Sequence, residues 1–286
     1  MSRFNTFLKR FSQFNIAEKL IVINVVCFVV PFFLRSILFL FDMPPQSFLS
    51  LFELPSSLET FIYQPWSLFT YGFLHDSLGH IFWNMLLLYY ASQFFLNLFS
   101  SQRFINVYFM GILLGGLVFL LSYAIFPVFK DQSPQMVGAS AGVMAVLIFS
   151  CTYMPTQEVR LLFFNVKLMY VGIALVIVDI LQIPTGNAGG HLAHIGGAGL
   201  GYFYAQQLQN GKDIGSDFER FWKWLSNLFK AKPKMTTVHK STTRKTRKPT
   251  TSNQEKIDRI LDKISASGYD SLSKEEKDYL FKAGKK

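Results

Sequence analysis

The sequence predicts an all-α polytopic membrane protein: a bundle of six transmembrane helices with a cytosolic tail that ends in a small helical hairpin. Half of its 286 residues are hydrophobic and only 16% are charged, and the mean hydropathy is +0.27. Six apolar runs are each close to the about 17–25 residues that a membrane-spanning helix needs. The period-two alternation of a membrane β-barrel is absent, so we expect no strands in these runs.

The six apolar runs organise the chain as far as Leu208. They cover residues Ala17–Phe41, Gly79–Phe99, Phe104–Phe126, Gly138–Met154, Val166–Ile183 and Gly190–Leu208. The first run contains Pro31 and Arg35. It is nevertheless too long for a signal peptide, and no small-x-small cleavage site follows it, so we expect it to be retained as a helix.

The segment before the first run, residues 1–16, has the pattern of a short helix lying on the membrane surface. Lys9 and Arg10 accompany an apolar helical face, as in interfacial amphipathic helices. That face consists of Phe4, Phe7, Leu8 and Phe11.

Loop charges predict the orientation of the bundle. One set of ends carries the basic residues Arg3, Lys9, Arg10, Lys19, Arg103, Arg160 and Lys167. The opposite connections hold the acidic residues Asp42, Glu53, Glu59, Asp76 and Asp131, with Lys130 as their one basic residue. The positive-inside rule therefore places both termini in the cytosol.

This topology brings polar residues from distant parts of the sequence to one depth. The second, fourth and sixth helices all run inward from the outer face. His80 and Ser140 lie in the first turns of the second and fourth helices, and His194 lies about one turn into the sixth. With about 1.5 Å of rise per residue, all three lie within a turn or two of the outer boundary. Polar residues are costly within a membrane, which makes these three candidates for a functional site.

Paired glycines offer a way for two of these helices to touch. Gly138 and Gly142 are four residues apart on the fourth helix, and Gly197 and Gly201 are four apart on the sixth. Small residues at this spacing let helix backbones approach closely. We therefore expect a tight contact between the fourth and sixth helices that brings His194 within hydrogen-bond reach of Ser140.

A serine beside a histidine predicts nucleophilic catalysis. The imidazole of His194 would take the hydroxyl proton of Ser140 and later return it to the leaving group. His80 and Asn84 share a face of the second helix and could point together at a developing negative oxygen, joined by backbone N–H groups of the fourth helix. No carboxylate is evidently placed to orient His194, and Asp179 is expected to be a helix-end residue facing the interface or the cavity mouth.

Three motifs resemble those of the rhomboid intramembrane serine proteases, over roughly residues 17–208. They are His75-x4-His80-x3-Asn84, Gly138-x-Ser140 and Ala193-His194-x2-Gly197-x3-Gly201. The resemblance implies Ser140 as nucleophile, His194 as general base, and His80 and Asn84 as oxyanion stabilisers. It also implies cleavage of transmembrane substrates near the outer membrane face.

Two positions depart from the family pattern. Ala141 stands where the family usually has glycine after the serine, and its methyl group could crowd the contact between the fourth and sixth helices. The first outer connection keeps Trp66, but Ser67 replaces the arginine that often follows, which questions how this loop is anchored.

Other functions are compatible with parts of this pattern. His191-x2-His194 has the spacing of metal ligands, but a His-Glu-x-x-His signature is absent and no Cys or carboxylate evidently completes a site, so neither metal nor cofactor is expected. A non-catalytic rhomboid-like protein that binds transmembrane helices is the alternative function. A transporter lacks support, since an inverted repeat with paired broken helices is not found. The connection Pro184–Gly190 is either a lid over the site or a tight flexible turn.

The tail differs sharply in composition from the bundle. After Leu208 the tail has 19 Lys and Arg residues against 10 Asp and Glu residues. The tail therefore carries nearly all of the formal net charge of +10. Five segments are expected along the chain: residues 1–16, the catalytic bundle 17–208, a juxtamembrane amphipathic helix in 209–230, a disordered basic linker 231–253 and a helical hairpin 254–286. In the hairpin we expect an apolar stripe of Ile257, Ile260, Leu261 and Ile264, and a capping box of Ser273 with Glu276.

The expected partners follow from this organisation. We expect the protein to bind transmembrane protein substrates and anionic lipid headgroups, and we do not expect it to bind nucleic acid. A single compact chain without a transit peptide favours the bacterial plasma membrane.

Overall fold

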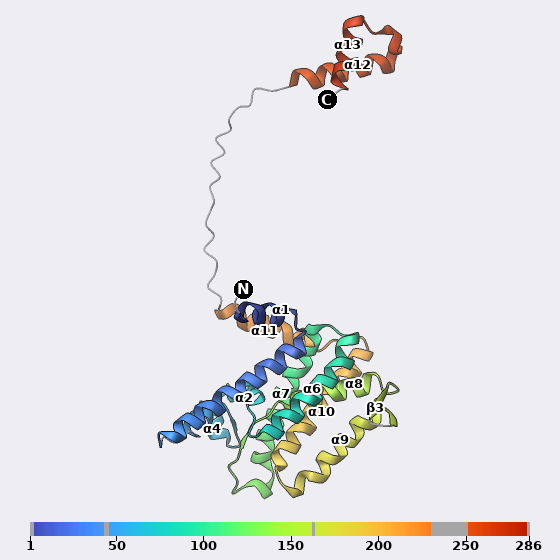
Figure 1. Ribbon diagram of the computed structural model, residues 1–286. Helices are drawn as coiled ribbons and strands as arrows, with labels where there is room; N and C mark the ends of the chain where they lie inside the picture. The colour runs from blue at the N-terminus through green and yellow to red at the C-terminus, as the bar shows by residue number, and fades with distance from the viewer. Residues whose placement is uncertain (1–2, 43–45, 162–163, 230–250, 285–286) are drawn as a thin grey trace. The chain divides into compact units, whose positions relative to one another are not determined.

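The computed structural model describes residues 3–42, 46–161, 164–229 and 251–284 (Figure 1). The chain forms two compact units, Met1–Lys230 and Ala231–Lys286. The first unit contains the bundle and the second the hairpin.

Among the described residues of the first unit, six helices match the predicted apolar runs, each to within one helical turn (Figure 1). They are α2 (Ile16–Leu40), α6 (Leu78–Leu98), α7 (Ser101–Ile125), α8 (Ser140–Tyr153), α9 (Leu168–Gln182) and α10 (Ala188–Gln209). Polar caps mark three of the starts: the side chains of Asn15, Ser77 and Ser100 accept hydrogen bonds from the first turns of α2, α6 and α7. The predicted all-α fold is confirmed.

Within the described part of the chain, three helical segments are long and apolar enough to cross a membrane: α2, α7, and α9 with its continuation to Thr185. The helix α8 is apolar but shorter. The helices α6 and α10 have 21 and 22 residues, but polar groups lower their hydropathy. The count of six membrane spans therefore stays a prediction.

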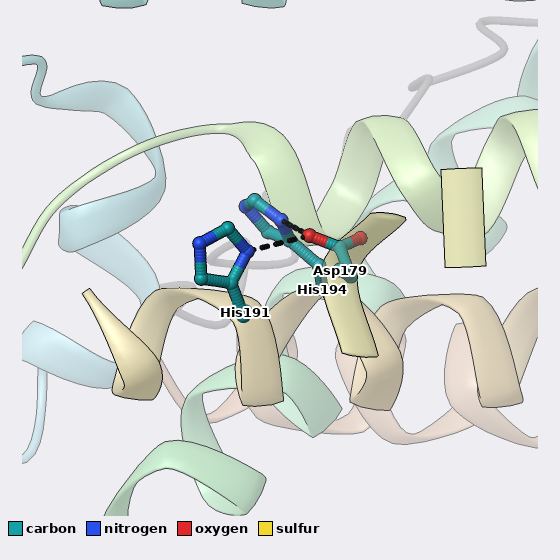
Figure 2. Close-up of side chains that lie close together, drawn as sticks. All are labelled: Asp179, His191 and His194. Atoms are coloured by element: carbon teal, nitrogen blue, oxygen red, sulfur yellow. Dashed lines mark hydrogen bonds and ion pairs between the residues drawn. The ribbon is translucent and has the colours of Figure 1, made fainter. Parts of the chain in front are cut away.

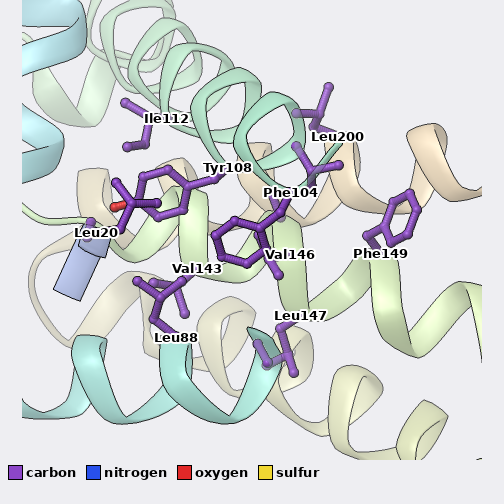
Figure 3. Close-up of a cluster of buried hydrophobic side chains, with 14 of the residues drawn as sticks. Leu20, Leu88, Phe104, Tyr108, Ile112, Val143, Val146, Leu147, Phe149 and Leu200 are labelled. Atoms are coloured by element: carbon purple, nitrogen blue, oxygen red, sulfur yellow. The ribbon is translucent and has the colours of Figure 1, made fainter. Parts of the chain in front are cut away.

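The helix α8 lies at the centre of the bundle. It contacts α6, α7, α9 and α10, with the most extensive contact to α10. Nearly every residue of α8 is buried, and the surrounding core includes Leu88, Tyr108 and Leu200 from three other helices (Figure 3). Large apolar side chains on α2 and α9 are exposed, as expected of helices whose outer faces meet lipid.

The connections hold short elements that the sequence pattern did not predict. Short helical turns are α3 (Gln46–Leu49), α4 (Leu58–Tyr63), α5 (Ser67–Thr70), η1 (Tyr71–Phe73), η2 (Pro127–Phe129) and η3 (Ile183–Thr185). Two antiparallel strand pairs also form: β1 (Leu54–Pro55) with β2 (Gln135–Met136), and β3 (Glu158–Leu161) with β4 (Phe164–Lys167). These strands are too short for periodicity to reveal. Only Val166 and Lys167 of β4 lie within a predicted apolar run, at the start of the fifth, where the expectation of no strand is wrong.

Two further helices flank the bundle, α1 (Arg3–Gln13) and α11 (Gly215–Phe229), and both match predicted amphipathic segments. The side chains of Phe4, Phe7 and Leu8 lie outside the described residues. A polar network holds the start of α11: Asp213 accepts hydrogen bonds from Arg103 at 2.8 Å and from Tyr204 at 2.5 Å. This network joins α7, α10 and the connection to α11.

The second unit is a helical hairpin of α12 (Thr251–Ser267), η4 (Tyr269–Ser271) and α13 (Lys274–Ala283). Ser273 and Glu276 form the predicted capping box. Ile260 and Leu272 are buried, whereas Leu261 is 49% exposed, so this unit covers only part of the predicted apolar stripe. A hairpin turn lets only one side of α12 be covered. Most of the predicted linker, residues 231–253, lies outside the described residues.

Candidate active site

Ser140 is the first residue of α8, and the segment before it is held on two sides. Met136 of β2 pairs with Leu54 of β1, and the backbone N–H of Gly138 donates to the carbonyl of Tyr71 at 3.0 Å. Gly138 has φ +130°, a conformation that favours glycine, and a β-carbon there would lie 2.8 Å from Nε2 of His80. This turn therefore directs the chain into α8 next to His80.

His194 of α10 lies directly against Ser140. Its Nε2 is 2.6 Å from Oγ of Ser140. A β-carbon at Gly197 would overlap the carbonyl oxygen of Ala141, and one at Gly201 would overlap that of Ala145. Both glycines of α10 thus meet the backbone of α8, and this close approach carries His194 to the serine.

The glycines before and within α8 have different positions from those expected. Gly138 precedes the helix rather than belonging to it. Gly142 faces α7, where a β-carbon would lie 2.9 Å from the carbonyl oxygen of Tyr108. Neither glycine supplies the contact with α10, because Gly197 and Gly201 of α10 meet the backbone carbonyl oxygens of Ala141 and Ala145. The expectation of facing glycine pairs on both helices is therefore wrong for α8.

The methyl group of Ala141 lies against α7 rather than between α8 and α10. A β-carbon on Gly115 would lie 2.5 Å from that of Ala141. Gly115 thus leaves the space that the extra methyl group occupies. The crowding expected at the contact between α8 and α10 does not occur.

Asp179 of α9 is the residue whose place sequence reasoning missed. Its Oδ1 lies 2.8 Å from Nδ1 of His194 and 2.8 Å from Nδ1 of His191 (Figure 2). The residue is buried, with 7% of its surface exposed. The expectation that no carboxylate orients His194, and that Asp179 faces the interface or the cavity mouth, is wrong. A signal was present: apart from Glu18 at the start of α2, Asp179 is the one acidic residue in the six apolar helices.

These contacts assign the proton positions on His194. An ionised carboxylate only accepts hydrogen bonds, so Nδ1 of His194 is the donor to Asp179. Neutral His194 then has an unprotonated Nε2, which accepts the hydroxyl hydrogen of Ser140. Such an arrangement can remove a proton from the serine as its oxygen attacks an electrophile.

His80 and Asn84 line the same cavity as Ser140 and His194. The cavity has a volume of about 530 Å³ and also includes Gly138 in its wall. One N–H of the Asn84 amide donates to the backbone carbonyl of His80 at 3.0 Å, which leaves its second hydrogen for another acceptor. The first turn of α8 has no side-chain cap, so its backbone N–H groups are further donors.

A carboxylate also accompanies His80. Nδ1 of His80 lies 2.8 Å from Oδ1 of Asp76, which precedes α6. Burial alone would raise the pKa of Asp76, but hydrogen bonds and the charge interaction with His80 outweigh it and lower that pKa. Burial and the neighbouring His80 lower the pKa of His75 to about 4. His75 is therefore neutral at pH 7.

The same cluster has the atoms of a possible metal site. Donor atoms of Asp179, His191 and His194 all lie within 4.8 Å of one another. A carboxylate thus does accompany the His191-x2-His194 pair, contrary to the expectation. Both histidines, however, use Nδ1 to donate to one oxygen of that carboxylate, and His194 uses Nε2 for Ser140. The hydrogen bonds to Asp179 are therefore enough to bring the donor atoms of these three side chains together.

The connections around the site are held by backbone contacts. The indole N–H of Trp66 donates to the carbonyl of Leu51 at 2.8 Å, and Thr70 donates to that of Phe52 at 2.8 Å. These bonds anchor the first connection although Ser67 replaces the arginine. Between η3 and α10 only Gly186 and Asn187 are non-helical, which makes this connection a tight turn.

The rhomboid domain family matches residues 63–210, and a family of unknown function (DUF6576) matches residues 243–286. The chain is similar to RHOMBOID-like protein 12, mitochondrial, of Arabidopsis thaliana, with 30% identity over 51% of this chain and 47% of that protein. It is also similar to Presenilin-associated rhomboid-like protein A, mitochondrial, of Danio rerio, with 28% identity over 56% of this chain and 39% of that protein.

The matched segments thus span less than half the length of these two relatives. The rhomboid match, by contrast, covers more than half of this chain and contains Ser140, His194, His80 and Asn84. Together with the apolar helices, it shows a multi-pass membrane protein. This chain belongs to the rhomboid family.

Proposed function

We propose that this protein is an intramembrane serine endopeptidase that cleaves transmembrane segments of membrane-anchored proteins. The observation that carries the proposal is the 2.6 Å contact between Oγ of Ser140 and Nε2 of His194 in the wall of a cavity. A serine and a histidine at this distance form an activated nucleophile. Membership of the rhomboid family supports the same reading.

The reaction would proceed in two halves. Ser140 attacks the carbonyl carbon of the scissile peptide bond while its proton passes to Nε2 of His194. The tetrahedral intermediate then collapses as His194 gives that proton to the leaving amine, and an acyl-enzyme remains. Water enters, loses a proton to His194 and attacks the ester, which releases the carboxylate product and restores the Ser140 hydroxyl.

The negative oxygen of each tetrahedral intermediate needs donors. His80, Asn84 and the first backbone N–H groups of α8 surround the cavity beside Ser140 and are proposed for this role. Asp76 accepts from Nδ1 of His80, so Nε2 of His80 donates only when the ring is protonated.

Membrane orientation is part of the proposal. With both termini in the cytosol, α6, α8 and α10 begin at the outer face, and cleavage occurs near that boundary. We place the protein in a bacterial plasma membrane, although both relatives described above are named as mitochondrial proteins. The exposed aromatic side chains and basic residues of α11 suit binding to anionic lipid headgroups.

A purified-protein assay tests the proposed activity. Wild type and Ser140→Ala are compared for cleavage of a reporter protein with one transmembrane segment, in liposomes. We expect cleavage by wild type and a loss of about 10³-fold or more in Ser140→Ala, since the nucleophile is removed. A serine-directed fluorophosphonate should label wild type and not the variant. Equal activity of the two proteins would exclude the mechanism, and failure to label folded wild type would support a helix-binding, non-catalytic function.

A further inference from the structure

We propose that Asp179 is a positioning residue that completes a Ser140–His194–Asp179 triad, with His191 holding the same carboxylate in place. The proposal rests on the proposed proteolytic function and adds a third member to its Ser–His pair. It concerns a side chain on α9, whereas the serine and histidine come from α8 and α10.

The geometry is that of a relay of oriented groups. Oδ1 of Asp179 lies 2.8 Å from Nδ1 of His194. On the other side of the same ring, Nε2 of His194 lies 2.6 Å from Oγ of Ser140. The carboxylate side chain is 10% exposed and that of His194 is 23% exposed, so water competes little for the bond between them. A buried carboxylate on Nδ1 keeps the ring in the tautomer that leaves Nε2 free, and it stabilises the imidazolium formed during attack.

His191 explains how the carboxylate itself is fixed. His191 and His194 are three residues apart on α10 and therefore share a face. Both donate from Nδ1 to the same oxygen of Asp179, each at 2.8 Å (Figure 2). Two donors from one helix hold the Asp179 oxygen against α10. They also satisfy a buried charge that would otherwise be costly.

Asp179→Asn is the decisive substitution, because it keeps the size of the side chain and removes the charge. The amide can donate an N–H to Nδ1 of His194, which favours the tautomer with the proton on Nε2 and leaves Ser140 without a base. We expect kcat to fall by about 10²–10⁴-fold with KM changed by less than about 3-fold, since Asp179 does not touch the substrate.

Two further variants separate positioning from folding. His191→Gln removes the second donor but leaves the bond between His194 and Asp179, and kcat should fall by less than about 10-fold. Asp213→Asn is the control. Asp213 follows the far end of α10, away from the site, and its carboxylate also accepts hydrogen bonds from two side chains, those of Tyr204 and Arg103. This substitution should lower the unfolding temperature and leave kcat within about 2-fold of wild type.

A spectroscopic measurement does not depend on turnover. Protein labelled with ¹⁵N-histidine reports which ring nitrogen of His194 carries the proton, and His194→Gln and His191→Gln assign the signals. We expect Nδ1 protonated and Nε2 unprotonated in wild type, and a shift of the proton to Nε2 in Asp179→Asn. An unchanged tautomer, or kcat of Asp179→Asn within about 3-fold of wild type, would overturn the proposal.

The proposed function and the triad fail in different ways. Wild type and Ser140→Ala with equal activity would remove the proteolytic function, whereas Ser140-dependent cleavage that survives Asp179→Asn would remove only the triad. Chelator-sensitive activity restored by zinc would also overturn the triad, because the three side chains would then be metal ligands.

Discussion

Gly197 of α10 lies so close to the carbonyl oxygen of Ala141 in α8 that any side chain at position 197 would overlap it. The obstacle is backbone, which cannot rotate away as a side chain would. Ala141 follows Ser140 directly, and Gly197 lies one turn beyond His194. The helix contact and the distance between serine and histidine are therefore set by the same pair of residues.

Gly197→Ala should separate α8 from α10. We expect a loss of at least about 1–3 kcal/mol in the free energy of unfolding, typical of overpacking, together with a strong loss of activity. Gly199→Ala is the matched control on the same helix, because a β-carbon there meets nothing within 4 Å. Thermal unfolding in detergent and reporter cleavage measure both effects. Equal behaviour of the two variants would contradict this account of the contact.

Asp76→Asn should weaken oxyanion binding without altering the nucleophile. Nδ1 of His80 loses the carboxylate that orients its ring, and kcat should fall about 10–10²-fold, less than the ~10²–10³-fold expected for loss of a donor. Glu59→Gln is the control, since Glu59 is an exposed carboxylate in the same connection. Because the pKa of Asp76 is lowered, its contribution is complete above the ordinary aspartate pKa of about 4 and is lost as pH falls through the lower folded value. Cleavage rates from pH 3 to 7 give the profile, and an Asp76→Asn enzyme as active as wild type at pH 7 would refute the role.

Asp213 should make the anchoring of α11 depend on pH. Burial acts to raise its pKa, but hydrogen bonds from Tyr204 and Arg103 outweigh this and lower the pKa. The stabilisation is therefore present above about pH 4 and declines as pH falls through the lower folded value. Asp213→Asn should cost about 1 kcal/mol at pH 7, discounted for partial exposure, and less at pH 3.

The control for this prediction is Asp217→Asn. Asp217 pairs with Arg220 on the exposed surface of α11, where ion pairs contribute little. Thermal unfolding at both pH values compares the two variants. A pH-independent loss in Asp213→Asn would show that its charge is not what holds the network.

The helices were predictable because each depends on local properties of the sequence. Long apolar runs mark α2 and α7, and the serine caps Ser77 and Ser100 mark two of the starts. The strand pairs and short turns of the connections were not predictable, since each is two to four residues long and depends on pairing with distant segments.

Part of the candidate site was also predictable. Alternating helix direction puts His80, Ser140 and His194 at one depth, and the fold brings them to one cavity. Asp179 was at a suitable depth as well, but depth does not tell which way a side chain faces. The rotation of α9 about its own axis depends on its packing against α8 and α10, and no local pattern records it.

The sequence by itself determined the apolar helices, their order and the family motifs, because hydropathy, length and residue spacing are local quantities. Only the tertiary structure decided which faces meet: Gly115 rather than α10 receives the methyl group of Ala141, and Asp179 turns inward to two histidines. Those contacts join residues from different helices, and their geometry depends on helix rotation and close packing. Gly197 and Ala141 show the reason directly, since a backbone contact between two helices is a property of the pair and of neither sequence segment alone.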